Sequence, residues 1–221
     1  MSAGLIRIDE FLRGGGPFHP ARVKRLPWWS LAVLILCFSP LYGSLMGSFH
    51  FVSAERIYQI AFAGIKMPLL LFATSVLCLP AFFVLNSILG LRDDLRESLL
   101  AILAGQAALS IVLAALAPLT RFWYFSGSTY RAALLFNAGA FALATFAGHI
   151  VMSRYYRQLI LRHRHHRIGL YAWVLMYAFV GIQMGWTLRP FIGAPDEPVT
   201  FFRAGPFSNA YVVVAGLVFG G

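Results

Sequence analysis

Five polar side chains interrupt long apolar stretches of this sequence: Asn86, Gln106, Asn137, His149 and Gln183. Amide and imidazole groups are costly to place in an apolar medium unless they form hydrogen bonds. We therefore expect these residues to make polar contacts between neighbouring helices.

Two cations stand beside prolines at the ends of apolar stretches. Lys66 precedes Pro68, which predicts that a helix begins there and that the ammonium group snorkels to the outer membrane interface. Arg189 is followed by Pro190, which prevents a helix from continuing. Two cations at one depth could hold a phosphate or a carboxylate, such as that of a lipid headgroup. Alternatively, each cation only anchors its own helix.

The segment 163–167 reads His-Arg-His-His-Arg, a composition that resembles a metal site. Its charged neighbours are arginines, and no carboxylate or cysteine joins it, so a divalent cation would be repelled. We predict instead a basic collar on anionic headgroups, worth about 1 kcal/mol for each basic side chain near the surface. The arginines of this collar are Arg157, Arg162, Arg164 and Arg167.

Histidine also raises the question of haem. A haem held by two histidines across a bundle needs them at matching depth on different helices. His149 lies near one end of its apolar stretch, whereas His50 lies just beyond the opposite end of another. We therefore expect no haem, no other cofactor and no metal from this chain alone.

Signatures of catalysis are missing from the sequence. It contains no G-x-S-x-G, no H-E-x-x-H and no Walker-type phosphate loop. All acidic residues lie outside the apolar stretches, so a proton relay or an ion-coupled carrier would lack its usual carboxylate. We predict that the protein is not an enzyme.

Small residues recur at every fourth position in four of the apolar stretches. They are Gly43 and Gly47, Ala101 and Gly105, then Ala140, Ala144 and Gly148, and finally Gly181 and Gly185. This spacing makes a groove along a helix that lets another backbone approach closely. Such a groove is filled either within the same bundle or by a partner subunit.

Composition indicates a membrane protein. Of 221 residues, 59% are hydrophobic and 12% charged, whereas soluble domains have about 45–50% and about 25%. Five stretches are long enough to cross about 30 Å of hydrocarbon: 28–46, 67–90, 99–119, 132–152 and 168–188. A further apolar stretch, 210–221, is too short to span and forms either a re-entrant piece or part of a sixth helix. The predicted fold class is all-α, a polytopic transmembrane bundle of five helices, or six.

Charge and spacing divide the chain into three regions. Residues 1–26 form a tail that is either disordered or a short amphipathic helix in the headgroup region, residues 27–190 form the bundle, and residues 191–221 form a Pro/Gly-rich outer tail. The formal charge is +10, with 12 Lys and Arg on the side of the N-terminus and 6 on the opposite side. This bias places the N-terminus in the cytoplasm. Nucleic-acid binding is not expected, because the aromatic residues lie in the spans.

Two motifs resemble those of a poorly characterised group of bacterial polytopic inner-membrane proteins, loosely likened to Yip1-type five-helix proteins. The first runs from Lys66-Met67-Pro68-Leu69-Leu70-Leu71 through Cys78-Leu79-Pro80 to Asn86-Ser87-Ile88-Leu89-Gly90. The second is Trp186-Thr187-Leu188-Arg189-Pro190-Phe191-Ile192-Gly193-Ala194-Pro195, followed by Phe201-Phe202-Arg203. The resemblance implies a similar bundle in a bacterial inner membrane and brings no known activity. The His/Arg-rich segment 163–167 departs from the pattern of the group.

Together these observations predict a non-enzymatic membrane subunit that packs against other membrane proteins and organises or stabilises a larger complex. The alternative is a lipid or small-solute handling protein, such as a channel, transporter or scramblase-like factor. It would use Lys66 and Arg189 on the outer side and the arginine collar on the inner side. The expected partners are anionic lipids on the cytoplasmic side and other membrane protein subunits.

Overall fold

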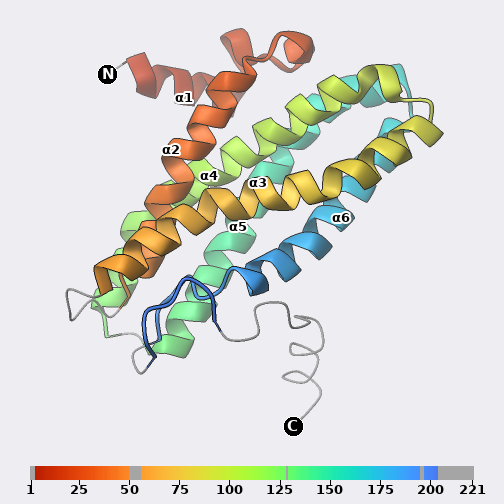
Figure 1. The fold of residues 1–221 in the computed structure, drawn as a ribbon. Helices are drawn as coiled ribbons and strands as arrows, with labels where there is room; N and C mark the ends of the chain where they lie inside the picture. Colours follow the sequence, from red (N-terminus) through yellow and green to blue (C-terminus); the bar gives the residue numbers. More distant parts are fainter. Residues whose placement is uncertain (1–2, 50–55, 128, 195–196, 204–221) are drawn as a thin grey trace.

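The computed structural model describes residues 3–49, 56–127, 129–194 and 197–203. Five helices in this part of the chain are long and apolar enough to span a membrane. They are α2 (Trp28–Gly47), α3 (Arg56–Ile88), α4 (Leu95–Phe125), α5 (Tyr130–Arg162) and α6 (His166–Thr187), shown in Figure 1. The predicted all-α bundle with five spanning helices is confirmed. The stretch 210–221 and His50 lie outside the described residues.

Three helices extend well beyond the apolar stretches that predicted them. α3 and α5 each have 33 residues and α4 has 31, whereas about 20 residues cross the hydrocarbon. α3 begins at Arg56, about three turns before the predicted start, so Pro68 lies inside the helix and not in its first turn. The predicted start is wrong because the first turns of α3 carry polar residues whose partners come from a segment distant in sequence.

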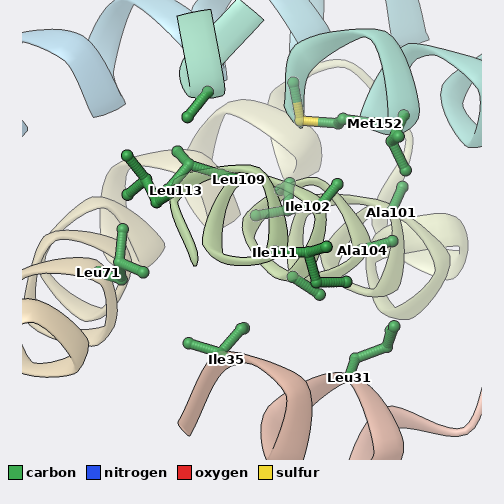
Figure 2. Close-up of a cluster of buried hydrophobic side chains, with 14 of the residues drawn as sticks. Leu31, Ile35, Leu71, Ala101, Ile102, Ala104, Leu109, Ile111, Leu113 and Met152 are labelled. Carbon is green, nitrogen blue, oxygen red and sulfur yellow. The ribbon is translucent and has the colours of Figure 1, made fainter. Parts of the chain in front are cut away.

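Helix α4 lies at the centre of the bundle. Figure 2 shows it between Leu31 and Ile35 of α2 on one side and Met152 of α5 on the other, with Leu71 of α3 nearby. Of the five spans, α4 has the largest buried share, 67% of its most apolar window. Its many alanines let neighbouring helices approach on more than one side.

Two helix pairs pack so closely that only glycine fits between their backbones. A Cβ at Gly47 of α2 would lie 2.5 Å from the Gln59 carbonyl oxygen of α3, and one at Gly43 would overlap the Ala63 carbonyl oxygen. On the other side of α4, a Cβ at Gly148 of α5 would lie 2.6 Å from the Gly105 carbonyl oxygen. These small-residue grooves are therefore filled from within the bundle.

Helix α6 packs mainly on α3. Phe82 of α3 and Trp173 of α6 meet edge to face, with ring centroids 5.0 Å apart. In contrast, α6 makes few contacts with α5, and α3 makes few with α4. The α3–α6 pair is consequently separated from the α4–α5 pair along part of the bundle.

The N-terminal residues form α1 (Ala3–Arg13), followed by the short 3-10 helices η1 (Gly16–Phe18) and η2 (Pro20–Arg25). We call the end of the bundle that they cover the α1 end (Figure 1). Tyr155 Oη of α5 donates to the Phe18 carbonyl oxygen at 2.7 Å, and Arg154 Nη1 donates to the Leu12 carbonyl oxygen at 2.6 Å. Phe11 is buried. These contacts hold the N-terminal segment on α5.

A network of ion pairs joins five elements at the α1 end. Arg162 of α5 lies 2.8 Å from the Glu97 carboxylate and 3.3 Å from that of Asp94, which belongs to η3 (Arg92–Asp94). Lys24 of η2 lies 3.2 Å from Glu97. His166 Nε2, at the start of α6, lies 3.0 Å from Asp94 Oδ2. The two carboxylates thus bring together η2 and the ends of α4, α5 and α6.

Candidate functional site

A cavity of about 360 Å³, which we call the lateral cavity, lies between α4, α5 and α6. Its wall is formed by Ile102, Gly105, Gln106, Leu109, Thr145, Phe146, Gly148, His149, Met152, Trp173, Val174, Tyr177 and Ala178. Thr145, Phe146 and Ala178 are exposed at its rim. They lie near the middle of α5 and α6, so the cavity opens sideways at the depth of the hydrocarbon.

The polar groups of the lateral cavity come from α4, α5 and α6. His149 Nδ1 is buried and has no hydrogen-bond partner among the described residues. The Gln106 side-chain amide donates to Ser75 Oγ of α3, a contact between helices. Because a buried polar atom without a partner is unfavourable, His149 Nδ1 is the atom at which a bound molecule would gain a hydrogen bond.

A second cavity of about 380 Å³ lies on the α3 side of α4. It shares Ile102, Gln106 and Trp173 with the lateral cavity, so the two spaces adjoin through these side chains. Trp28 and Arg96 line it toward the α1 end. The two cavities occupy the space that separates the α3–α6 pair from α4.

Asn137 of α5 joins three helices through hydrogen bonds. Its Oδ1 accepts from Tyr42 Oη of α2 at 2.8 Å, and its Nδ2 donates to Tyr124 Oη of α4 at 2.7 Å. The same nitrogen donates to the Ala133 carbonyl oxygen at 2.7 Å. Both polar atoms of this buried amide are satisfied, which makes Asn137 a structural contact.

The remaining polar residues of the spans, Asn86 and Gln183, are placed differently. The Asn86 amide donates to the Phe82 carbonyl oxygen of its own helix at 2.8 Å, and its Oδ1 faces Gly169 of α6. Gln183 is half-buried on α6, where its backbone carbonyl oxygen accepts a hydrogen bond from Thr187 Oγ1 at 2.9 Å. Neither residue lines the lateral cavity or the second cavity.

Lys66 requires a correction, because it does not snorkel to an interface. It is fully buried about three turns after the start of α3. Its Nζ donates to the Pro190 carbonyl oxygen at 2.9 Å and lies 4.7 Å from the centre of the Phe201 ring. The ammonium group therefore forms its contacts inside the protein. It neither contacts a lipid headgroup nor anchors its helix at the membrane interface.

The partners of Lys66 belong to residues 188–194 and 197–203, which we call the return segment. Figure 1 shows this segment, in dark blue, beside the beginning of α3, in orange. The Gln59 amide donates to the carbonyl oxygens of Pro190 and Phe191, each at 3.2 Å, and Arg56 donates to that of Ala194 at 3.0 Å. These side chains hold the return segment against α3.

The basic collar is only partly available for headgroups. Arg162 is engaged by Glu97 and Asp94, so the prediction that it contacts headgroups is not supported. Arg157, Arg164 and Arg167 are exposed, and the last two line an open groove with His165. These three arginines form the part of the collar that can reach lipid.

The small-residue grooves are occupied to different degrees. Gly43, Gly47 and Gly148 contact neighbouring backbones, and Ala140 and Ala144 are buried. On α6, a Cβ at Gly181 would make an ordinary contact of 3.7 Å with Thr74. A Cβ at Gly185 would meet nothing within 4 Å among the described residues. Among the described residues, only the α6 groove is left open.

Sequence reasoning missed several residues at the two ends of the bundle: Arg56, Gln59, Glu97, Glu197 and Arg203. Arg56, Gln59, Ala63 and Lys66 recur at helical spacing, which could have indicated a common face before the first apolar stretch. No comparable signal linked Glu97 to Arg162, because the two are far apart in sequence. Neither did any signal single out Glu197, and Arg203 was included in the second motif without a predicted partner.

Comparison of the chain with protein-family models, with curated proteins and with solved structures finds no match in any of the three. The resemblance to Yip1-like membrane proteins therefore stays a prediction. The described part of the chain is all-α, with five helices long and apolar enough to span a membrane.

Proposed function

We propose that this protein is a non-enzymatic, lipid-handling protein of the bacterial inner membrane that binds an amphiphile in the lateral cavity. Support comes from the wall of the cavity, which is apolar except for a few groups on three helices. Its rim at Thr145, Phe146 and Ala178 faces the hydrocarbon, so an acyl or prenyl chain can enter from the bilayer. The volume lies within the range of about 300–1,000 Å³ that is usual for ligand sites.

One observation carries this proposal: the buried Nδ1 of His149, which has no hydrogen-bond partner among the described residues, in a largely apolar wall. A purely hydrocarbon ligand would leave this atom unsatisfied. A hydroxyl, carbonyl or ester group on the ligand would pair with it, since imidazole both donates and accepts hydrogen bonds. The ligand that fits is a long apolar chain with a polar group near one point along it.

The experiment is photo-cross-linking in nanodiscs that contain a phosphatidylcholine with a diazirine in its acyl chain. Ala178→Trp places an indole at the rim of the cavity and should lower cross-linking to α5 and α6 at least about fivefold, because tryptophan covers a large area. Ala142→Trp is the matched control, since Ala142 is an exposed alanine of α5 outside the cavity wall. Equal cross-linking of the two variants would refute the proposal.

His149→Leu tests the polar half of the proposal. This variant removes the imidazole and leaves an apolar side chain in its place. It should still be cross-linked by the acyl-chain diazirine, but it should no longer prefer ligands that carry a polar group. Competition between palmitic acid methyl ester and hexadecane measures that preference. The wild type should favour the ester, and the variant should not.

The orientation proposed for the protein places the α1 end in the cytoplasm. The excess of Lys and Arg at that end, 12 against 6, supports this placement. Alkaline phosphatase fused after residue 127 should be active, whereas a fusion after residue 164 should be inactive. The reverse pattern would contradict the proposed orientation. It would not affect the proposal that the lateral cavity binds an amphiphile.

A second candidate function is that of a membrane subunit that stabilises a larger complex. The open groove at Gly181 and Gly185 favours it, because α6 is also the least buried of the five spans. Gly185→Leu should then abolish copurification of a stoichiometric partner from native membranes. Gly139→Leu is the control, because Gly139 of α5 also has open space around it. A wild-type protein that purifies as a monomer without a partner would exclude this candidate.

A further inference from the structure

A pocket of about 390 Å³ lies at the end of the bundle opposite the α1 end. We call it the arginine pocket, because Arg189 and Arg203 of the return segment form part of its wall. Met46, Leu134, Asn137, Phe141 and Trp186 form other parts of the wall. It shares no residue with the lateral cavity, so an inference about it does not rest on the proposed function.

Both guanidinium groups have N–H donors that make no hydrogen bond among the described residues. The Nε atoms of Arg189 and Arg203 are buried without a hydrogen-bond partner among the described residues. Arg203 pairs through Nη2 with Glu197, which leaves its Nε unused. The guanidinium of Arg189 lies 3.4 Å from the centre of the Trp186 ring. Stacking on a ring face orients the group and keeps its in-plane N–H donors available.

The charges of the pocket are unbalanced. Burial and the nearby positive charge of Arg203 both lower the pKa of Arg189, while Glu197 opposes them. Arginine nevertheless stays charged at any physiological pH. One carboxylate therefore faces two guanidinium groups, and an additional anion would offset the remaining charge.

Asn137 and Lys66 are not the groups that would hold this anion. The amide of Asn137 is occupied by two tyrosines and a carbonyl oxygen. Lys66 donates to the Pro190 carbonyl oxygen and does not line the pocket. The two arginines are thus the cationic donors of the wall.

We infer that the arginine pocket binds an oxyanion, a phosphate or a carboxylate, between Arg189 and Arg203. Guanidinium groups form paired, charge-assisted hydrogen bonds with such anions. Met46, Leu134 and Phe141 provide an apolar wall beside them for the carbon atoms attached to the anion. The pocket lies just past the end of α6, at the depth where headgroups meet the hydrocarbon. The anion comes either from a lipid headgroup or from a soluble solute.

The test measures binding of two probes to the full chain. One probe is phosphatidylglycerol, titrated into phosphatidylcholine nanodiscs and followed by native mass spectrometry. The other is inorganic phosphate, followed by the thermal shift of the detergent-purified protein. Saturable binding of phosphatidylglycerol alone assigns the pocket to a headgroup. A thermal shift with inorganic phosphate as well assigns it to the oxyanion in general, and both results support the inference.

Variants connect the binding to the pocket. Arg189→Gln combined with Arg203→Gln should weaken binding of the anionic probe about tenfold to a hundredfold, because two charge-assisted contacts are lost. Arg131→Gln is the matched control: Arg131 is an exposed cation in the first turn of α5, at the same end, and does not line the pocket. It should leave the affinity unchanged.

A second variant keeps the test valid if loss of the arginines disturbs folding. Leu134→Trp alters the partly exposed side of the pocket without removing a charge, and it should also lower affinity about tenfold by steric exclusion. The inference is overturned if neither probe binds the wild type. It is also overturned if Leu134→Trp and the arginine variant bind phosphatidylglycerol as tightly as Arg131→Gln does.

Discussion

Helices α2 and α6 carry the same pair of glycines four residues apart, and the two pairs lie in opposite environments. Gly43 and Gly47 of α2 press directly against the backbone of α3. Gly181 of α6 makes only an ordinary approach to α3, and Gly185 faces open space among the described residues. One sequence pattern has thus produced a closed groove and an open one.

The surface that each groove meets explains this difference. Opposite α2, helix α3 offers Ala63 and Gly64, so both backbones can come together. Opposite Gly181, the same helix offers the branched side chain of Thr74, which keeps α6 further away. A glycine pair therefore permits close contact, and the residue on the facing helix decides whether the contact forms.

The largest effect is expected for the closed groove. Gly43→Ala would place a methyl group against the Ala63 carbonyl oxygen and 2.5 Å from Met67 Cγ. Because a backbone atom cannot move aside, we expect a loss of about 2–3 kcal/mol in the free energy of unfolding. Unfolding by SDS in mixed micelles measures this loss. Gly139→Ala, in open space on α5, is the control and should be near neutral.

A smaller loss is expected where α3 is held by hydrogen bonds to the return segment. Lys66→Met removes the charged donor to Pro190, which alone would cost about 1.5–3 kcal/mol. Part of this cost is offset because methionine does not place a charge in the protein interior. We expect a net loss of about 1 kcal/mol.

The second readout for Lys66→Met is limited trypsin digestion. Release of the return segment should speed cleavage after Arg203, because Pro190 blocks tryptic cleavage after Arg189. Arg131→Met should leave the rate of cleavage after Arg203 unchanged. Unaltered cleavage in Lys66→Met would show that Gln59 and Arg56 suffice to hold the segment.

The sequence predicted the five spans well, because lipid requires about 20 consecutive apolar residues for each crossing. It could not predict that α4 is central. Its alanines suit a buried helix, but helix faces turned toward lipid are apolar too, so hydrophobicity does not separate the two in a membrane. For the same reason, the sequence could not decide whether each glycine groove is filled by a helix of the same bundle or by a partner subunit.

The polar sites were predicted less completely, since their partners are distant in sequence. Asn137 was expected to contact other helices, but nothing indicated Tyr42 and Tyr124 as its partners. Lys66 was misplaced because Pro68 suggested a helix start, whereas three turns of α3 precede it. Those turns are stabilised by carbonyl groups of the return segment, which have no sequence signature.

A weaker effect is expected where the close contact is made by a side chain that can move. A Cβ at Gly64 would lie 2.5 Å from Ser44 Oγ, and its next neighbour, the Pro40 carbonyl oxygen, is 3.5 Å away. Rotation of Ser44 relieves the overlap, so Gly64→Ala should cost about 0.5–1 kcal/mol, less than Gly43→Ala. The double variant with Ser44→Ala should recover most of this loss. A cost as large as that of Gly43→Ala, unrelieved in the double variant, would mean that α2 and α3 tolerate no adjustment.

The smallest effect is expected in the open groove of α6. Gly185→Ala adds a methyl group that meets no described atom within 4 Å, so it creates no overlap. Alanine is the better helix former by about 0.8–1.0 kcal/mol in aqueous peptides, and we expect a change between zero and a slight gain in unfolding free energy. Unfolding of the purified protein by SDS measures this change in unfolding free energy in the absence of a partner subunit. A loss above about 1 kcal/mol would require a contact on α6 like the one at Gly43, and the difference between the two grooves would then disappear.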